Sequence, residues 1–488
     1  MSAVVSPFGT ATDHGDAGTL RFLTSYTYWS IAQWDNDGFL GGRRRLRPSA
    51  PMRPRQRLAG WLTLVEASGA RATYSPALVD WCLESLTSTS CSAPSAGVDL
   101  SMLTVVVPSL NRQDYVLRQV RYWSSSSAHL IIVDGSSSPL SDRIRSAIEA
   151  HPRITYRHVV SSLPDRLGLA GGLIKTPYAV MLGDDEFHLQ TGLSASVAAL
   201  EENPDLVGCT GQVLRFTPVG RYRRIAFERA YPTMHGYSIR HPAPVDRLIA
   251  AMSGYNAATC YAVLRSPIWQ KSWGSVGNWG AGAAIELQQA AAVYLLGGFA
   301  TTNCVQWLRS DENPPGNASP DEKDLRVKFQ EWWLDQPYEA ERSAFVSLLV
   351  DSVSDELGAD HDECAAWVVA GAEAYVASIY IDGNSWKNEW PPQGPVSRLR
   401  SVVATMLRAV VRRLPDPLTL RARRWRGQML RLLGRWGGNY YGTVEDLPRI
   451  CRSESLTIPP DAIAEIALIE VMVREFHALP VQGAPGEV

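Results

Sequence analysis

The apolar positions of residues 101–220 form short continuous runs that alternate with stretches of helical periodicity. The runs are LTVVV at 103–107, LIIV at 130–133 and YAVML at 178–182. Uninterrupted apolar runs of this length are typical of strands buried on both faces of a sheet. Helical stretches such as residues 144–150 separate them. The alternation predicts right-handed βαβ units, and hence an α/β fold with a mostly parallel, Rossmann-like sheet flanked by helices.

The pattern changes to a helical one after residue 320. Apolar side chains at 399–414 recur at i, i+3 and i+4, as on one face of a helix. The part before residue 101 shows little periodicity and ends in a Ser/Thr/Pro-rich stretch that is typical of a linker. We therefore expect an N-terminal accessory segment (1–100), an α/β domain (101–320), a helical extension (321–395) and a basic amphipathic helical C-terminal region (396–488).

Basic residues are concentrated in the C-terminal region. Residues 397–437 contain 11 arginines and a single acid, Asp416. A basic amphipathic helix pair with tryptophans suits the surface of an anionic membrane. The alternative interpretation is that the apolar stripe packs on the rest of the protein while the arginines face water.

Composition narrows the class of protein. A formal net charge of −2 argues against general nucleic-acid binding. The seven cysteines are scattered without a C-x-x-C pair, which favours reduced thiols over a disulfide framework or a zinc site. We see no signal-peptide pattern and no apolar stretch that approaches the roughly 18 residues of a membrane span. We expect a cytoplasmic protein, either soluble or bound peripherally to the inner face of the membrane.

Acidic residues follow two of the apolar runs directly. Asp134 comes after LIIV, and Asp184, Asp185 and Glu186 come after YAVML and a glycine. Open α/β sheets bind ligands at the carboxyl ends of their strands, so these acids should meet at one edge. Adjacent carboxylates repel one another, and a divalent cation with oxygen ligands offsets that cost. The alternatives are an acidic turn that opens a helix, and, for Asp134, an Asx-turn.

Three segments together resemble a known family. VVVPSLNR (105–112), IIVDGSS (131–137) and YAVMLGDDEF (178–187) occur in this order. They resemble the motifs of the family 2 nucleotide-sugar glycosyltransferases, which have the GT-A fold, and of an uncharacterised bacterial subgroup with a D-D-D-F segment. This chain has Glu186 where that subgroup has an aspartate, so the identity of the metal-binding carboxylates stays open.

The resemblance implies a nucleoside-diphosphate sugar donor, a UDP-sugar first of all, and a bound Mg²⁺ or Mn²⁺. Asp185 and Glu186 are the expected metal ligands. Arg166 lies in a glycine-rich segment, 161–175, which we interpret as a loop. It is either a nucleotide contact or a surface partner of Asp165. The full set expected around the nucleotide is Pro108, Ser109, Asn111, Arg112, Asp134, Arg166 and Asp184.

The resemblance also implies a catalytic base farther along the chain. In the family, an acid that opens a helix about 100 residues after the metal motif takes the proton of the acceptor hydroxyl. Glu286 fits this description, because it follows the glycine-rich stretch 274–282. The alternative is a glutamate that merely stabilises the helix dipole. Asp311 and Glu312 are rival bases, and Arg309 is placed to hold the leaving diphosphate.

We therefore expect an inverting, metal-dependent glycosyltransferase that moves a sugar to an acceptor hydroxyl on a glycan, a lipid-linked molecule or a small molecule. One alternative is a nucleotidyltransferase, although that class needs a glycine-rich Arg/Lys loop where this chain has PSLNR. The other is an inactive scaffold that binds partners through its arginine-rich tail.

Overall fold

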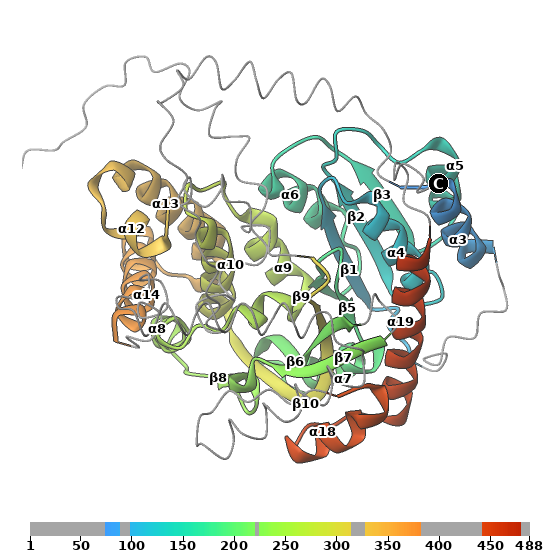
Figure 1. Ribbon diagram of the computed structural model, residues 1–488. Coiled ribbons are helices and arrows are strands. Elements are labelled where there is room, and N and C mark those ends of the chain that lie inside the picture. Colours follow the sequence, from blue (N-terminus) through green and yellow to red (C-terminus); the bar gives the residue numbers. More distant parts are fainter. Residues whose placement is uncertain (1–73, 88–97, 220–223, 314–326, 382–441, 480–488) are drawn as a thin grey trace, which may run out of the picture.

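The computed structural model describes residues 74–87, 98–219, 224–313, 327–381 and 442–479. Most of the predicted accessory segment and the whole basic stretch 397–437 lie outside the described residues. The described residues contain a ten-stranded sheet with helices on both sides, as Figure 1 shows. The predicted α/β class is confirmed.

Four parallel strands form the half of the sheet in which the acidic residues lie. In spatial order they are β3 (Ile154–His158), β2 (His129–Asp134), β1 (Leu103–Ser109) and β4 (Tyr178–Met181). All seven residues of β1 are buried, as expected for a strand covered on both faces. The helices that connect these strands are α4 (Gln113–Trp123), α5 (Asp142–Glu149) and α6 (Leu163–Leu173).

Beyond β4 the sheet is mixed rather than parallel. Its further strands are β9 (Val263–Arg265), β6 (Leu206–Val219), β10 (Gly298–Ser310) and β5 (Phe187–His188), with β7 (Arg224–Ala230) on β6 and β8 (Ser238–Ile239) on β10. The pair of β6 and β10 is parallel, and the other pairs are antiparallel. β9 and β5 have only three and two residues. Strands so short show no periodicity, so the antiparallel direction of these strands could not be predicted from the sequence.

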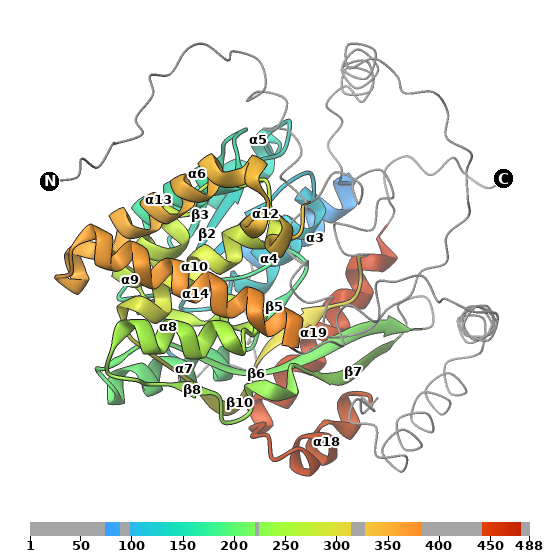
Figure 2. The ribbon, with the colours of Figure 1, turned by 90° about the vertical axis from the view of Figure 1, so that its left-hand side faces the viewer.

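A helical layer covers the second half of the sheet. It consists of α8 (Pro244–Ser253), α9 (Ser266–Ser272), α10 (Gly282–Leu296), α12 (Phe329–Leu334), α13 (Glu339–Leu357) and α14 (His361–Ile381) (Figure 2). The helix α10 is buried along most of its length. On another side, α7 (Gln190–Glu202) packs so closely on β10 that a Cβ at Gly192 would lie 2.4 Å from the Cα of Gln306. None of the described helices combines the length and the apolar character needed to cross a bilayer.

The segment 161–175 is a helix, α6, and not the loop that its glycines predicted. Ser162 caps the helix: its Oγ accepts from the Asp165 backbone N–H at 3.2 Å, and the Asp165 carboxylate accepts from the Ser162 N–H at 3.2 Å. Pro164 stands in the first turn, where its missing N–H costs nothing. This capping box starts the helix, and packing tolerates the glycines farther along.

The C-terminal helix α19 (Pro460–Ala478) lies along α4 and β7 (Figure 1), with α3 (Pro76–Thr87) and α18 (Leu447–Ser453) near its two ends. Its buried Glu465 accepts a hydrogen bond from the Tyr122 hydroxyl at 2.5 Å. It also accepts from the backbone N–H of Gln190, at the start of α7, at 3.0 and 3.1 Å. Burial raises the pKa of Glu465 to about 7. One side chain thus joins α19 to two helices of the α/β domain.

We expect Glu465→Ala to lower the free energy of unfolding by about 2 kcal/mol, because it leaves a buried backbone donor of α7 without its acceptor. Urea unfolding followed by circular dichroism would measure this. Glu201→Ala, at an exposed position near the end of α7, is the control and should change stability by less than about 0.5 kcal/mol. Equal losses for the two variants would contradict this role of Glu465.

Candidate active site

The carboxyl ends of β1, β2 and β4 meet at one edge of the sheet. Ser109, the last residue of β1, lies opposite Asp134 in the register with β2. Its Oγ donates a hydrogen bond of 2.8 Å to Oδ2 of Asp184, just beyond β4. The acids that the sequence placed after two separate strands are therefore neighbours, as expected for strand ends in a parallel sheet.

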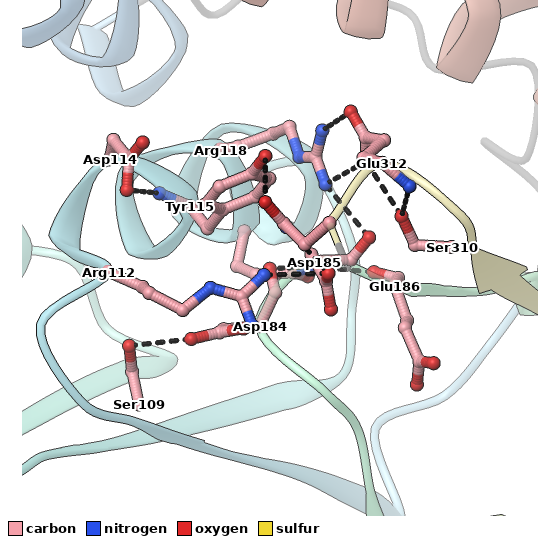
Figure 3. Close-up of polar contacts among 12 residues, drawn as sticks. Ser109, Arg112, Asp114, Tyr115, Arg118, Asp184, Asp185, Glu186, Ser310 and Glu312 are labelled. Carbon is pink, nitrogen blue, oxygen red and sulfur yellow. Dashed lines mark hydrogen bonds and ion pairs between the residues drawn. The ribbon is translucent and has the colours of Figure 1, made fainter. Parts of the chain in front are cut away.

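Arg112 bridges two of the three consecutive acids (Figure 3). One terminal nitrogen of its guanidinium lies 3.0 Å from Oδ1 of Asp184, and the other lies 2.6 Å from Oδ2 of Asp185. The amide nitrogen of Asn313 donates to the same Asp185 oxygen at 2.8 Å. Burial raises the pKa of Asp184 to about 6, and the positive charge of Arg112 only partly opposes that rise. The two carboxylates thus converge on one cation.

Glu186 turns away from this pair. Its Oε2 accepts a hydrogen bond of 3.1 Å from the indole N–H of Trp307, and the residue is buried. Figure 3 shows its carboxylate pointing away from Asp184 and Asp185. Burial raises its pKa well above the usual range. We expected Asp185 and Glu186 to form the metal pair, but the structure brings Asp185 together with Asp184.

Two polar side chains of α4 bind the backbone of the acidic turn, and no sequence pattern pointed to either of them. The Gln119 amide donates to the backbone carbonyls of Asp184 at 2.9 Å and of Glu186 at 2.6 Å. Arg118 donates to the carbonyl of Asp185 at 2.9 Å. They occupy buried positions on an amphipathic helix, where a sequence pattern suggests packing only. The turn is therefore fixed by backbone contacts that leave its carboxylates available.

Arg118 and Glu312 form a fully buried ion pair next to the site. Both terminal nitrogens of Arg118 contact the Glu312 carboxylate at 2.8 Å. Nε2 of His477, at the end of α19, lies 2.5 Å from Oε1 of Glu312, an oxygen that Arg118 also contacts. Burial alone would raise the pKa of Glu312, but Arg118 and His477 outweigh it and lower the pKa to about 2. Glu312 is thus a charged partner of Arg118, which does not suit the rival-base role.

Asp134 is sealed inside the protein, with no exposed surface. Its carboxylate accepts from the Gln113 amide at 2.7 Å, from the Tyr156 hydroxyl at 2.7 Å and from the Ser136 backbone N–H at 2.8 Å. The last bond is that of an Asx-turn. Asp134 therefore stabilises the loop after β2. This is the Asx-turn role that the sequence offered as the alternative to nucleotide binding.

Of the remaining residues predicted to bind the nucleotide, two are buried in the protein and one is exposed at its surface. Pro108 is buried in β1, opposite Val133. Arg166 is 2% exposed and donates to the carbonyls of Ser109 and, at 3.1 Å, Val133. It therefore clamps the ends of β1 and β2 and is not a surface partner of Asp165. Asn111 is exposed at the turn after β1, with a φ of 54° that asparagine tolerates.

Glu286 lies in α10, in the other half of the fold. Its Oε2 is shielded from solvent and has no hydrogen-bond partner among the described residues. Burial raises its pKa to about 8. Burial is the main cause of the raised pKa of Tyr261. The negative charges of Glu186 and Glu286 raise it further, so both carboxyls act electrostatically on the Tyr261 hydroxyl. The Tyr261 ring stacks on Trp307 with centroids 3.9 Å apart. Of the two carboxyls, Glu186 contacts this aromatic pair, through the indole N–H of Trp307.

Arg309 and Asp311 lie at the far end of β10. Arg309 is nearly buried, has its guanidinium 5.9 Å from the Tyr231 ring centroid and lowers the pKa of Glu186 against the effect of burial. The positive charge of Arg309 therefore acts on Glu186. Asp311 is exposed, accepts from the Thr217 hydroxyl at 3.2 Å and donates its N–H to the carbonyl of Phe216.

A divalent cation fits the Asp184–Asp185 pair better than it fits the triplet. No three His, Cys, Asp or Glu side chains in the described part of the chain are grouped as metal ligands. The guanidinium of Arg112, however, is a stand-in cation that shows where two carboxylates converge. Carboxylate oxygens are the donors that Mg²⁺ and Mn²⁺ prefer.

No family model and no curated protein matches this chain. Among solved structures it is similar to those of S. aureus TarS. The similarity to TarS 1-349 in complex with UDP-GlcNAc covers 58% of this chain and 92% of that chain, at 11% identity and a TM-score of 0.34. The similarity to TarS 1-349 in complex with UDP covers 58% of this chain and 91% of that chain, at 11% identity and a TM-score of 0.32. These values mark a distant likeness.

Glu286→Gln tests the buried carboxyl through the pH dependence of stability. Because the folded-state pKa is raised from 4.5 to about 8, the folded protein retains a proton that the unfolded chain releases above pH 4.5. The wild type should therefore lose stability relative to the variant as pH rises from 4.5 to 8, by at most about 1.4 kcal/mol per pH unit. Denaturant unfolding at several pH values would measure the difference. A difference that stays constant with pH would contradict the raised pKa.

Proposed function

We propose that this protein is an inverting, metal-dependent glycosyltransferase of GT-A type, which moves a sugar from a nucleoside-diphosphate sugar to an acceptor hydroxyl. A UDP-sugar is the donor proposed first. The observation that carries the proposal is the convergence of Asp184 and Asp185 on one cation, beside the turn that follows β1. A cation held at that strand edge is what a diphosphate needs for its own charge to be balanced.

Asp184 and Asp185 would hold Mg²⁺ or Mn²⁺. When bound, such an ion neutralises the charge that develops on the departing diphosphate. Ser109 and Asn313 already orient the two carboxylates through hydrogen bonds of 2.8 Å each. Glu186 could bind the same metal only after breaking its hydrogen bond with the indole of Trp307. We therefore assign it a structural role in the turn.

The turn after β1 supports a nucleotide site by its position. Asn111 is exposed there, and its backbone N–H is tied to the Ser136 hydroxyl at 2.8 Å, which joins the turns after β1 and β2. Arg166 and Asp134 stabilise the backbone beside these turns through hydrogen bonds to the Val133 carbonyl and the Ser136 N–H, respectively. A ligand at this edge would thus meet a surface whose backbone is fixed before binding, which lowers the entropy cost of binding.

Glu286 is the base that the chemistry favours. A pKa raised to about 8 lies near neutral pH, which suits a group that exchanges a proton. The ionised form, which acts as the base, is then the minor one at pH 7. It would take the acceptor hydroxyl proton while that oxygen attacks the anomeric carbon. The bond from that carbon to the diphosphate oxygen breaks in the same step, and its electron pair leaves with the diphosphate. Attack from the opposite face inverts the anomeric centre.

Two features of the hypothesis stay predictions. The basic stretch 397–437, proposed to contact a membrane surface, lies outside the described residues. Asp311 remains the second candidate for the base, because it is exposed at the end of β10 with one side-chain hydrogen bond from Thr217.

Donor hydrolysis tests the proposed function, with water in the place of the acceptor. Purified protein with Mn²⁺ should release UDP from at least one of a panel of UDP-sugars. Asp185→Asn should lower that rate by at least about 100-fold, because the cation loses a charged ligand. Asp205→Asn, which removes only a surface ion pair with Arg240, is the control and should keep the wild-type rate. No release from any nucleotide sugar, and no binding of UDP by calorimetry, would rule out the proposal.

The base is tested by separating hydrolysis from binding. Glu286→Gln should lower hydrolysis by about 10²–10⁴-fold, the usual contribution of a positioned base. UDP affinity measured by calorimetry should stay within about twofold, because a base that acts on the acceptor does not hold the nucleotide. Asp311→Asn is the companion variant. If it loses hydrolysis while Glu286→Gln keeps it, Asp311 is the base.

A further inference from the structure

We infer that Arg112 is an internal cation that competes with the divalent metal for Asp184 and Asp185, so that a metal binds only by displacing its guanidinium. This rests on the proposed function in one respect, since it assumes that the carboxylate pair takes up a divalent cation.

The geometry of Arg112 is that of a bridging ion. Its guanidinium does not form a fork on a single carboxylate, which is the common arrangement for arginine. Instead, each terminal nitrogen contacts a different residue, at 3.0 Å for Asp184 and 2.6 Å for Asp185. A metal that used both carboxylates would need the space between them, which the guanidinium fills.

Arg112 differs from its two neighbouring arginines in how it is held. Arg118 has no exposed side-chain surface and is fixed by Glu312 and a backbone carbonyl. Arg166 is 2% exposed and is fixed by backbone carbonyls. The Arg112 side chain is 35% exposed, and its charged partners among the described residues are the two carboxylates. Of the three, it is the one with a path to solvent.

The backbone at Arg112 is anchored by contacts that do not involve its side chain. Its carbonyl accepts hydrogen bonds from the N–H groups of Tyr115 and Val116, in the first turn of α4. Its guanidinium lies 4.7 Å from the centroid of the Tyr115 ring, a contact that a modest rotation of the side chain can keep. Displacement therefore needs a change of rotamer and no change of fold.

The two carboxylates need a cation beside them both in the free protein and in the metal-bound protein. Asp184 and Asp185 are adjacent, and their side chains are only 7% and 17% exposed. Two such carboxylates without a counter-ion would repel each other in a partly dehydrated site. Arg112 supplies one positive charge to the free protein, and a divalent ion would supply two. The freed guanidinium would then stand at the mouth of the site, where it can contact the phosphates of a nucleotide.

The mechanism has a thermodynamic consequence. Metal alone must pull Arg112 from its partners and so binds weakly. A nucleotide diphosphate offers Arg112 a new partner, so metal and nucleotide should each raise the affinity of the protein for the other by the same factor.

The first test measures Mn²⁺ binding to the full chain without nucleotide, by electron paramagnetic resonance of the free ion. Arg112→Gln, which keeps a polar side chain but removes its charge, should bind Mn²⁺ at least about fivefold more tightly than wild type. Arg112→Lys keeps the charge and should stay near wild type. Asp185→Asn should lose binding. Unchanged or weaker binding by Arg112→Gln, or no Mn²⁺ binding by any variant, would overturn the inference.

The second test repeats the titration with saturating UDP. UDP should increase the Mn²⁺ affinity of wild type more than that of Arg112→Gln, because only the wild type transfers an arginine from carboxylate to phosphate. An equal increase in both would refute this transfer. Thermal unfolding of each variant checks that it is folded. The first test involves neither nucleotide nor turnover, so its result stands even if the protein transfers no sugar.

Discussion

The burial of two adjacent carboxylates at the end of β4 is the constraint on which the site depends. Asp184 and Asp185 follow a strand whose residues are all buried, and they have little contact with water. Their charge must be balanced where they stand, because transfer of an unpaired carboxylate from water costs several kcal/mol. Ser109, Asn313 and Arg112 provide that balance. The same requirement makes the place suitable for a metal and its anionic ligand.

A second layer fixes the position of this pair from the opposite end of the chain. Arg118 holds the carbonyl of Asp185 and is itself held by Glu312, which His477 contacts from α19. The ring of Phe476 lies under the same guanidinium, with its centroid 4.9 Å from the guanidinium carbon. The C-terminal helix is thus part of the support of the site and more than a cover of the sheet. Because a buried charge pair is costly to break, this layer resists movement while Arg112, on the exposed side, does not.

Glu186 and Glu286 show how neighbouring acids acquire different properties from their surroundings. Glu186 follows Asp185 directly, yet it is buried against Trp307 and its pKa rises for that reason. Glu286 comes from α10, a helix of the other half of the fold, and its charge raises the pKa of Tyr261, which stacks on Trp307. Its pKa rises because of burial, and its Oε2 has no hydrogen-bond partner in the part of the chain that the structure describes. Sites that move protons commonly contain such perturbed groups.

The sequence by itself determined the parallel half of the sheet, since continuous apolar runs that alternate with helical stretches are typical of strands covered on both faces. It also placed the acids at the ends of those strands. It could not show which acids share a cation, because a turn of three residues can direct any of them inward. The tertiary structure chose Asp184 and Asp185, buried Asp134 and Arg166 as supports, and brought Arg118, Glu312 and His477 together across more than 300 positions. Contacts of that separation have no local periodicity. Packing between distant elements alone decides them.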